Sequence, residues 1–434
     1  MSVTLPPTSA PAPFENVGVA PSLEARLVGQ LRGREDLEAY RAAGGYAEGA
    51  ERGGALIAAV EAAHLRGRGG AAFPTSVKWR SVAERPGPRY LLANGGEREP
   101  LSFKDRYLLG QRPHLVLEGL LLAAEAIGAE AAYVFVTESA LERSVVTAVA
   151  ELGSTAVPVL VHRADSGYAG AEETAAIRAI GGGPALPVAK PPRPYEQGLF
   201  GSPTLVQNVE TLANVPTIAH NGWEAFQAVG TDGSPGTFLL SASGECGAPG
   251  LYEVPLGIEL SAAFDAVAGG FAGTPKAFLV GGFFGGLLPA ADHSVTLDYD
   301  ELATRDSGLG CGAVHVVGPD RCPIGVAAEV MGYLAGESTG QCGPCVKGTA
   351  GMAETLTALI RGSADDEEIA RLERWSTALP GRGACGLLDG AALLARSVLR
   401  NFGEEVARHL SHGCATCGTN DRAGGAIAKE VRSR

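Results

Sequence analysis

Residues 67–79 read GRGGAAFPTSVKW, and this glycine-rich stretch is the most informative part of the sequence. Glycine has no Cβ, so backbone N–H groups at such a turn can approach a bound anion closely. A helix is expected to begin at Thr75, and its N-terminus would favour a phosphate. Lys78 would add a positive charge to the same site. From these residues alone, the alternative is a flexible surface turn without a ligand.

Around this stretch, strand-like and helix-like runs alternate from about Leu23 to Val229. Short β-rich or apolar runs predict strands, and longer apolar or amphipathic runs predict helices. The predicted strands are Tyr90–Ala93, Ala132–Val136 and Val157–Val161, and the predicted helices include Leu115–Ile127 and Ser139–Leu152. This alternation is typical of an α/β domain with a largely parallel sheet.

The pattern changes twice towards the C-terminus. From about Pro235, short strand-like pieces separated by Gly and Pro surround one helix candidate, Leu260–Val267, which predicts a small α+β insert. From Cys322 onward the apolar residues follow helical spacing, as at Ile324, Ala327 and Met331. Several such helices can bury their apolar faces only against one another, so the sequence predicts a C-terminal helical bundle.

Composition excludes some classes of function. The net charge of -13 makes the chain a poor ligand for polyanions, so nucleic acid is not an expected partner. We find no run of about 18 apolar residues, the length a membrane helix needs, so direct membrane insertion is not expected. Residues 1–22 are rich in Pro, Ser and Ala at their start, lack the pattern of a signal peptide, and are predicted to be a flexible tail.

The chain has eight cysteines, and four of them form two Cys-x-x-Cys pairs. The pairs are Cys342 with Cys345 and Cys414 with Cys417. In a long chain without an export signal, this usage favours metal or redox chemistry over structural disulfides.

Several ordered motifs carry a resemblance to a known family. Residues 67–79 resemble the FMN loop of the NADH-binding flavoprotein subunit of respiratory complex I (the F subunit of NADH-quinone oxidoreductase) and of its hydrogenase-associated relatives. Three further segments are similar to motifs of that family, in the same order: Asn94–Arg106, Tyr168 with Glu172–Thr174, and Pro203–Pro216. The chain thus resembles a divergent member of this family.

The resemblance implies a role for particular residues. Asn94 would hydrogen-bond the flavin side chain, Asn208 and Thr211 would line the same pocket, and Glu97 with Glu172 or Glu173 would border the nicotinamide nucleotide. The alternative for the carboxylates is a solvated helix face or a cap, and for Asn208 a turn or cap. The FMN phosphate and ribityl chain would be held by the loop and the lysine that follows it: Gly67, Arg68, Gly69, Gly70, Phe73 and Lys78.

The resemblance also implies a domain organisation. After the tail, residues 23–232 would form a Rossmann-like α/β domain for FMN and NADH. Residues 233–315 would form a β-grasp insert similar to the SLBB module. Residues 316–434 would form the helical bundle with an iron–sulfur loop.

Three positions near the expected flavin and NADH sites depart from the family pattern. Gly96 replaces an acidic residue of the flavin pocket, and Ser81 and Arg193 stand where the family has phenylalanines that stack on NADH. Each lost aromatic face removes about 0.5–1.5 kcal/mol of stacking. NADH is therefore the expected donor by resemblance, with a different donor as an alternative.

The cysteines leave three interpretations open. In the family, three thiolates from one loop and a fourth cysteine further on hold a [4Fe–4S] cluster; here Cys342, Cys345 and Cys385 match, whereas Thr339 replaces the first ligand. The fourth ligand would be a non-cysteine group or Cys414 or Cys417 from a tail that folds back. Zinc held by the two Cys-x-x-Cys pairs is the second interpretation. A lost cluster, with buried or disulfide-forming cysteines, is the third.

The remaining cysteines, Cys246, Cys311 and Cys322, are predicted to be packing residues, and histidines such as His409 to be surface or core residues. No side chain need act as a general acid or base, because the flavin carries the chemistry.

The first functional hypothesis is an NADH dehydrogenase-like, electron-transferring oxidoreductase subunit. FMN would take a hydride from NADH and pass single electrons to the [4Fe–4S] cluster, then to an iron–sulfur or membrane redox partner or a quinone. Such a subunit would be cytoplasmic, or peripheral at the membrane through its partner complex. The rival hypothesis is a degenerate paralogue that acts as a scaffold or assembly subunit.

Overall fold

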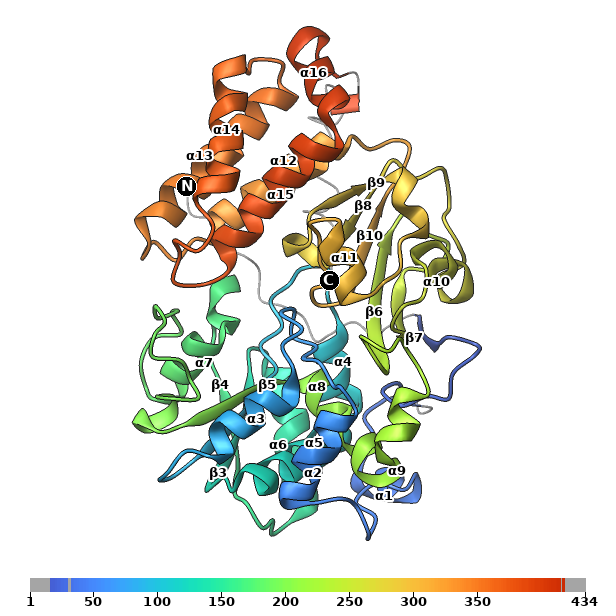
Figure 1. The fold of residues 1–434 in the computed structure, drawn as a ribbon, viewed down its shortest axis with the longest axis vertical. Coiled ribbons are helices and arrows are strands. Elements are labelled where there is room, and N and C mark those ends of the chain that lie inside the picture. Colours follow the sequence, from blue (N-terminus) through green and yellow to red (C-terminus); the bar gives the residue numbers. More distant parts are fainter. Residues whose placement is uncertain (1–15, 30–32, 415, 418–434) are drawn as a thin grey trace.

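A computed structural model describes residues 16–29, 33–414 and 416–417, and Figure 1 shows their arrangement. The chain builds a four-stranded sheet with its helices, then a six-stranded sheet, then a group of long helices. None of the helices in the described part of the chain combines the length and the apolar character needed to span a bilayer.

The first sheet is wholly parallel and has the strand order β4-β3-β2-β5. Helices cover both faces, because alternate residues of each strand point to opposite sides. Leu91 of β2 belongs to the core beneath α5, whereas Leu92 belongs to a smaller core with Ala176 of α7. The strands are β2 (Tyr90–Asn94), β3 (Ala131–Val136), β4 (Val159–Arg163) and β5 (Thr204–Asn208).

The helices of this region follow the predicted alternation. They are α1 (Leu37–Ala42), α2 (Gly53–Ala62), α3 (Thr75–Ala83), α4 (Lys104–Gln111), α5 (Pro113–Ile127), α6 (Ser139–Leu152), α7 (Glu173–Ile180), α8 (Val209–Ala213) and α9 (Val215–Gln227), with the short 3₁₀ turns η1 (Tyr168–Ala171) and η2 (Leu199–Gly201). The predicted parallel α/β sheet is thus confirmed.

The strand order creates a crevice between β2 and β5. The chain runs from β2 outward to β3 and β4, and then returns to place β5 on the other side of β2. At such a reversal the loops leave the sheet in opposite directions, which opens a space beyond the carboxyl ends of the strands. Asn94 and Asn208 are the last residues of β2 and β5 and pair in register there.

The second sheet is mixed and has the order β1-β7-β6-β10-β8-β9. Its strands are β1 (Val17–Val19), β6 (Thr237–Gly244), β7 (Gly250–Pro255), β8 (Ala277–Val280), β9 (Leu287–Pro289) and β10 (Ala313–Val317). Two helices, α10 (Leu260–Val267) and α11 (Tyr299–Thr304), and two 3₁₀ turns, η3 (Gly282–Phe284) and η4 (Ala290–Ser294), accompany it. Phe278 and Leu288 face the core with α10, whereas Leu279 and Leu287 face the helical bundle.

The N-terminal segment corrects the prediction of a flexible tail for residues 1–22. Val17–Val19 form β1, which pairs in parallel with β7 and so extends the second sheet. The buried carboxylate of Glu253 then accepts hydrogen bonds from the backbone N–H groups of Arg26, Leu27 and Val28, at 2.8–3.0 Å. These bonds stabilise the segment in place, because each pairs a backbone N–H group that would otherwise be buried without an acceptor. Residues 1–15 lie outside the described part of the chain.

The C-terminal helices form the predicted bundle. They are α12 (Pro323–Gly336), α13 (Gly343–Ile360), α14 (Asp366–Ala378), α15 (Leu387–Asn401) and α16 (Gly403–His412). Their shared core includes Met331, Met352, Leu356 and Leu394, all fully buried. Figure 1 shows α16 at the end of the bundle remote from the four-stranded sheet.

Candidate functional site

A cavity of about 1000 Å³ lies over the crevice between β2 and β5. Its walls come from all three regions of the chain: the glycine-rich stretch and the strand ends, the loop at Gly310, and the bundle, which contributes Leu387 and Arg396. A space of this size suits a cofactor together with a second ligand.

Every residue that sequence reasoning assigned to FMN or the nucleotide lines this cavity, with the exception of Arg68. The lining residues from that set are Gly67, Gly69, Gly70, Phe73, Lys78, Asn94, Glu97, Glu172, Glu173, Asn208 and Thr211. Segments far apart in the sequence thus meet at one place, as the order of the motifs predicts.

Arg68, which was expected to contact the cofactor, does not line the cavity. Its guanidinium is buried and donates to the carbonyl of Pro235 at 3.1 Å, beside the ring of Tyr299. Its backbone N–H donates to Thr211 Oγ1 at 2.8 Å. Arg68 therefore fixes the glycine loop to α8 and to the second sheet.

The glycine loop fits a closely approaching ligand. Gly70 has φ +113°, a region that L side chains rarely adopt, and a Cβ on Gly69 would lie 3.1 Å from Asn208 Cβ. Gly70 therefore needs glycine for its backbone conformation, and Gly69 leaves little room for a side chain. The loop leads into α3, whose N-terminus begins beside the cavity and would favour an anion there. Gln207 also lines the cavity, and its buried Nε2 has no hydrogen-bond partner among the described residues.

A buried ion network lies beneath the crevice. Lys104 Nζ contacts Asp105 Oδ1 at 2.6 Å, Asn208 Oδ1 at 2.9 Å and Glu210 Oε2 at 3.2 Å. Burial by itself would lower the pKa of Lys104, but the neighbouring carboxylates outweigh it and raise that pKa above its ordinary value. Lys104 therefore stays charged and orients the Asn208 amide.

The two asparagines at the strand ends are held by the protein. Asn94 Nδ2 donates to the carbonyl of Ala171 at 2.8 Å. Asn208 Nδ2 donates to Asp105 Oδ2 at 2.7 Å, and its Oδ1 also accepts from the Glu210 N–H at the start of α8. Asn208 is therefore a helix cap, the alternative that the sequence left open, and it also lines the cavity.

A second group of charges forms another part of the wall. Lys78 Nζ lies 3.3 Å from Glu173 Oε2, and Lys190 Nζ lies 2.9 Å from Glu172 Oε1 and 3.0 Å from Glu173 Oε1. Burial alone would raise the pKa of Glu173, but the two lysines outweigh burial and lower it. Glu172 also caps α7 by accepting from the Thr174 N–H at 2.7 Å. Sequence reasoning did not assign Lys190 to the site.

Two more carboxylates border the cavity. Glu97 accepts from the N–H groups of Asp105 and Arg106 at 3.3 and 3.2 Å, so it caps α4. Burial, reinforced by Asp105, raises the pKa of Glu97. Glu99, also missed from the sequence, accepts from Tyr168 Oη at 2.7 Å, and burial raises its pKa to about 7.

The positions that depart from the family pattern lie in different surroundings. Gly96 lines the cavity, and a Cβ there would meet the Phe135 ring at 3.0 Å, so this chain has little room for a larger residue. Ser81 lies on α3 and donates to the Val77 carbonyl, and Arg193 lies in an exposed loop; neither side chain lines the cavity. Phe73 is 52% exposed at the cavity wall and offers an aromatic face there.

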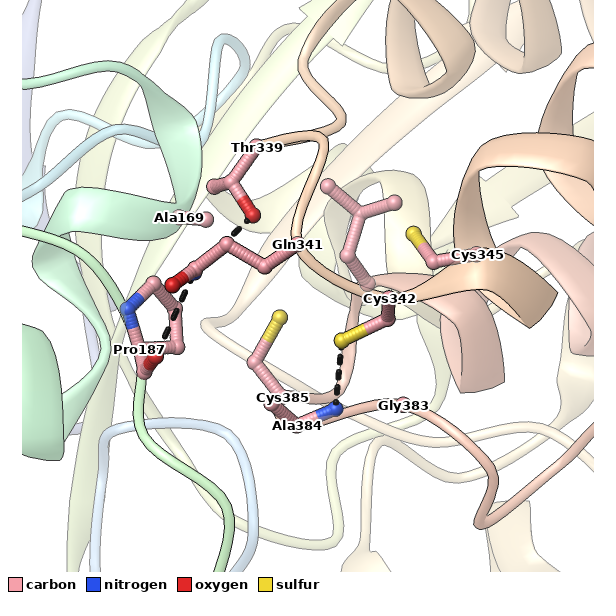
Figure 2. Close-up of a pocket in the computed structure, with 10 residues that line it drawn as sticks. Ala169, Pro187, Thr339, Gln341, Cys342, Cys345, Gly383, Ala384 and Cys385 are labelled. Atoms are coloured by element: carbon pink, nitrogen blue, oxygen red, sulfur yellow. Dashed lines mark hydrogen bonds between the residues drawn. The ribbon is translucent and has the colours of Figure 1, made fainter.

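Three cysteines surround a second, small cavity, shown in Figure 2. Cys342 and Cys345 come from the start of α13, and Cys385 precedes α15. The Ala384 N–H donates to Cys342 Sγ at 3.3 Å, which joins the two loops. Thr339, at the position of the missing family cysteine, lines the same cavity, as do Ala169 and Pro187 from the α/β region.

The two cavities are adjacent. Cys385, Leu387 and Ala169 line both of them. A group bound at the three cysteines would therefore lie next to a group bound over the β2–β5 crevice. This arrangement suits short-range electron transfer.

The other cysteine pair has different neighbours. Cys414 and Cys417 group with Cys322 and His409, not with the residues that line the cavity of the three cysteines. Cys322 packs in the core of the bundle as predicted, but it is not isolated. Cys246 is buried, and Cys311, which borders the large cavity, is half-buried.

Comparisons with known proteins find the same two regions. A family model described as the Nuo51 FMN-binding domain matches residues 60–217, and a model described as the NADH-ubiquinone oxidoreductase-F iron-sulfur binding region matches residues 325–409. The first match contains the glycine loop and both strand ends, and the second contains Cys342, Cys345 and Cys385.

Similar proteins extend this match over most of the chain. The second NADH-quinone oxidoreductase F subunit of Rhizobium meliloti is 36% identical over 396 residues, covering 86% of this chain and 94% of that protein. The F subunit of the Rickettsia felis enzyme is 34% identical, covering 82% and 88%. A crystal structure of an NAD+-reducing [NiFe]-hydrogenase in the H2-reduced state aligns with a TM-score of 0.76 and 32% identity, covering 87% of this chain and 68% of that chain.

Proposed function

Since the chain belongs to the family of NADH-quinone oxidoreductase F subunits, we propose that it is the NADH-oxidising, electron-transferring flavoprotein subunit of a larger redox complex. The single observation that carries this proposal is the adjacency of the large cavity and the three-cysteine cavity through Cys385. The scaffold alternative is not favoured, because the glycine loop and both cofactor regions match the family.

FMN in the large cavity would supply the conversion of a two-electron hydride donation by NADH into single-electron transfers. The backbone of Gly67, Gly69 and Gly70 would hold its anionic tail, and the buried Gln207 amide would donate to it. Lys78 and Lys190 lie on one wall, where each is paired with a carboxylate of Glu172 or Glu173. Phe73 would stack on an aromatic ring at the cavity wall, since its own ring is largely exposed.

The cysteine chemistry fits an iron–sulfur centre. Cys342, Cys345 and Cys385 would hold a [4Fe–4S] cluster through three thiolates, with a non-cysteine fourth ligand. Thr339 lines the same cavity, and its hydroxyl or a small external ligand would fill the fourth position. Cys385 would then be the ligand nearest to the flavin, because it also lines the large cavity.

The finer architecture and the partners are also part of the proposal. Residues 23–232 would form a Rossmann-like domain, and residues 233–315 would form a β-grasp domain similar to SLBB. Residues 316–434 would form the iron–sulfur bundle. The reversal of strand order at β2–β5 and the mixed second sheet support this division. The electron acceptor would be a partner iron–sulfur subunit or membrane arm, with the subunit cytoplasmic or peripheral through that partner.

The test is anaerobic purification of the full chain, followed by a visible spectrum and assays of FMN, iron and sulfide. We expect one FMN per chain, an iron–sulfur absorption shoulder, and bleaching of the flavin band by NADH. Cys385→Ser should lower the iron content, and the matched control Cys246→Ala, a buried cysteine near the second sheet, should keep it. A folded chain without flavin after reconstitution would contradict the proposal, and flavin bleached only by another reductant would reject NADH as donor.

A fourth thiolate tests the cluster site separately. Thr339→Cys restores the family ligand at a position that already lines the cavity. We expect higher iron retention in air and a changed electron paramagnetic resonance signal after reduction. An unchanged signal and iron content would exclude position 339 from the cluster's coordination.

A further inference from the structure

Four potential ligands meet where the chain beyond α16 returns to the start of α12. Cys322, His409, Cys414 and Cys417 place their ligand atoms within 4.8 Å of one another. His409 Nε2 lies 3.6 Å from Cys322 Sγ and 3.4 Å from Cys417 Sγ. We propose that these side chains form a closed, structural zinc site that fastens the C-terminal segment to the bundle, separate from both redox cofactors.

The orientation of His409 favours a metal ligand. Its ring is buried, and Nδ1 lies 2.7 Å from the carbonyl oxygen of Glu405, one turn earlier in α16. A carbonyl accepts but cannot donate, so Nδ1 carries the proton and Nε2 presents its lone pair to the sulfurs. Backbone carbonyls fix metal-binding histidines in this way.

The ligand spacing favours a single ion. In a tetrahedral zinc site with Zn–S bonds of about 2.3 Å, the ligand atoms lie roughly 3.8 Å apart, close to the separations seen here. The ligands of a [4Fe–4S] cluster bind four different irons and must be further apart. Three thiolates with one imidazole match Zn²⁺, and four protein ligands leave no open position for catalysis.

The start of α12 suits the charge of such a site. Binding of Zn²⁺ would release three thiol protons and leave a complex with a net charge of about -1. Cys322 is the N-cap of α12, a helix of 14 residues, so this charge would face the positive end of its dipole. Gly325 in the first turn of α12 lies beside Cys417, since a Cβ there would be in van der Waals contact with Cys417 Sγ at 3.6 Å.

The position in the fold indicates a structural role. Cys322 follows β10 and opens α12, whereas the other three ligands lie at and just beyond α16. The ion would thus close a long loop around the whole bundle. Neither Cys322, His409, Cys414 nor Cys417 lines the two cofactor cavities.

The test is the metal content of the purified full chain, measured by mass spectrometry together with FMN and iron. We expect one zinc per chain, reduced at least tenfold in Cys322→Ser, Cys417→Ser and His409→Ala. The control Cys246→Ala should keep its zinc. FMN and the iron of the cluster report folding, so zinc loss with both retained assigns the zinc to this site.

Cobalt provides a second measurement with its own spectroscopic signature. Growth with Co²⁺ in place of zinc should give the visible bands of tetrahedral cobalt thiolate, absent from Cys417→Ser grown in the same way. Three results would overturn the proposal: zinc below a tenth of an equivalent in the wild-type chain, zinc unchanged in the three variants, or a Cys322–Cys417 disulfide found by peptide mapping. None of these results depends on whether NADH reduces the flavin.

Discussion

Lys104 Nζ lies 2.9 Å from Asn208 Oδ1, so a buried ammonium group orients the amide that ends β5 at the large cavity. The same ammonium also neutralises Asp105 and Glu210. The geometry of the cavity floor therefore depends on a charge that is almost completely shielded from solvent.

Removal of this charge should be costly. Lys104→Met leaves Asp105 and Glu210 buried without their cation, which costs about 3–5 kcal/mol. We expect a lower midpoint of chemical unfolding and loss of FMN during gel filtration. The exposed Lys347→Met is the matched control and should leave both properties unchanged. Equal stability of the two variants would show that the buried network contributes little.

The loop at Gly70 provides a test of backbone conformation. Gly70→Ala forces a side chain into φ +113°, at a cost of about 1–2 kcal/mol. Because the loop borders the cavity, we expect FMN to bind about tenfold more weakly by fluorescence titration.

Its control is Gly54→Ala in α2, an exposed helical position with open space around the new methyl group. That change should stabilise the chain by about 0.5–1 kcal/mol and leave FMN affinity unaltered. Weakened FMN binding in both variants would mean that the effect does not come from the conformation of the loop.

Phe73 should contribute to substrate binding rather than to folding. Its exposed ring at the cavity wall can stack on a bound aromatic, worth about 0.5–1.5 kcal/mol, so Phe73→Ala should raise the KM for NADH about 2- to 12-fold. Steady-state kinetics with an artificial acceptor measure this, and kcat should change little. Phe200→Ala, which removes an exposed ring packed on Tyr90, should leave KM unchanged.

Glu99 should make stability depend on pH. Burial raises its pKa to about 7 from 4.5, so the native state binds its proton more tightly than the unfolded state. The stabilisation from this bound proton is complete below pH 4.5 and is lost as the pH rises through 7, at a cost of about 3 kcal/mol.

Glu99→Gln mimics the protonated form and should flatten this part of the stability curve, measured by chemical unfolding of the chain between about pH 5 and 8. Glu97, whose pKa is also raised, should leave a residual slope in the same direction. The exposed Glu130→Gln should retain the wild-type slope. An unchanged slope in Glu99→Gln would mean that Glu99 ionises with an ordinary pKa.

Local patterns predicted the large cavity well. The glycine loop, Asn94 and Asn208 each belong to a short motif, and parallel strands bring their carboxyl ends to one edge of a sheet. Arg68 belongs to the same motif as the glycines, but its side chain points away from the cavity. A sequence motif does not specify which way a side chain points. Whether Glu97 and Asn208 cap helices or face a ligand was open in the sequence, and the structure shows that each caps a helix and lines the cavity.

Contacts made through tertiary packing could not be predicted in the same way. Lys190 reaches the cavity only because its loop folds back onto the start of α7, and Glu99 lies within a motif but acquires its raised pKa from burial. Cys322 and His409 are 87 positions apart, and neither has ligand spacing with its sequence neighbours. The only signal in the sequence was the Cys414–Cys417 pair, and its partners depend on how α16 packs against the start of α12.

The wall of the large cavity extends from Gly67 to Arg396. This wall is therefore incomplete in a growing polypeptide until synthesis has passed α15. We expect a chain truncated before α15 to bind FMN more weakly than the full chain, even though its whole FMN loop is present.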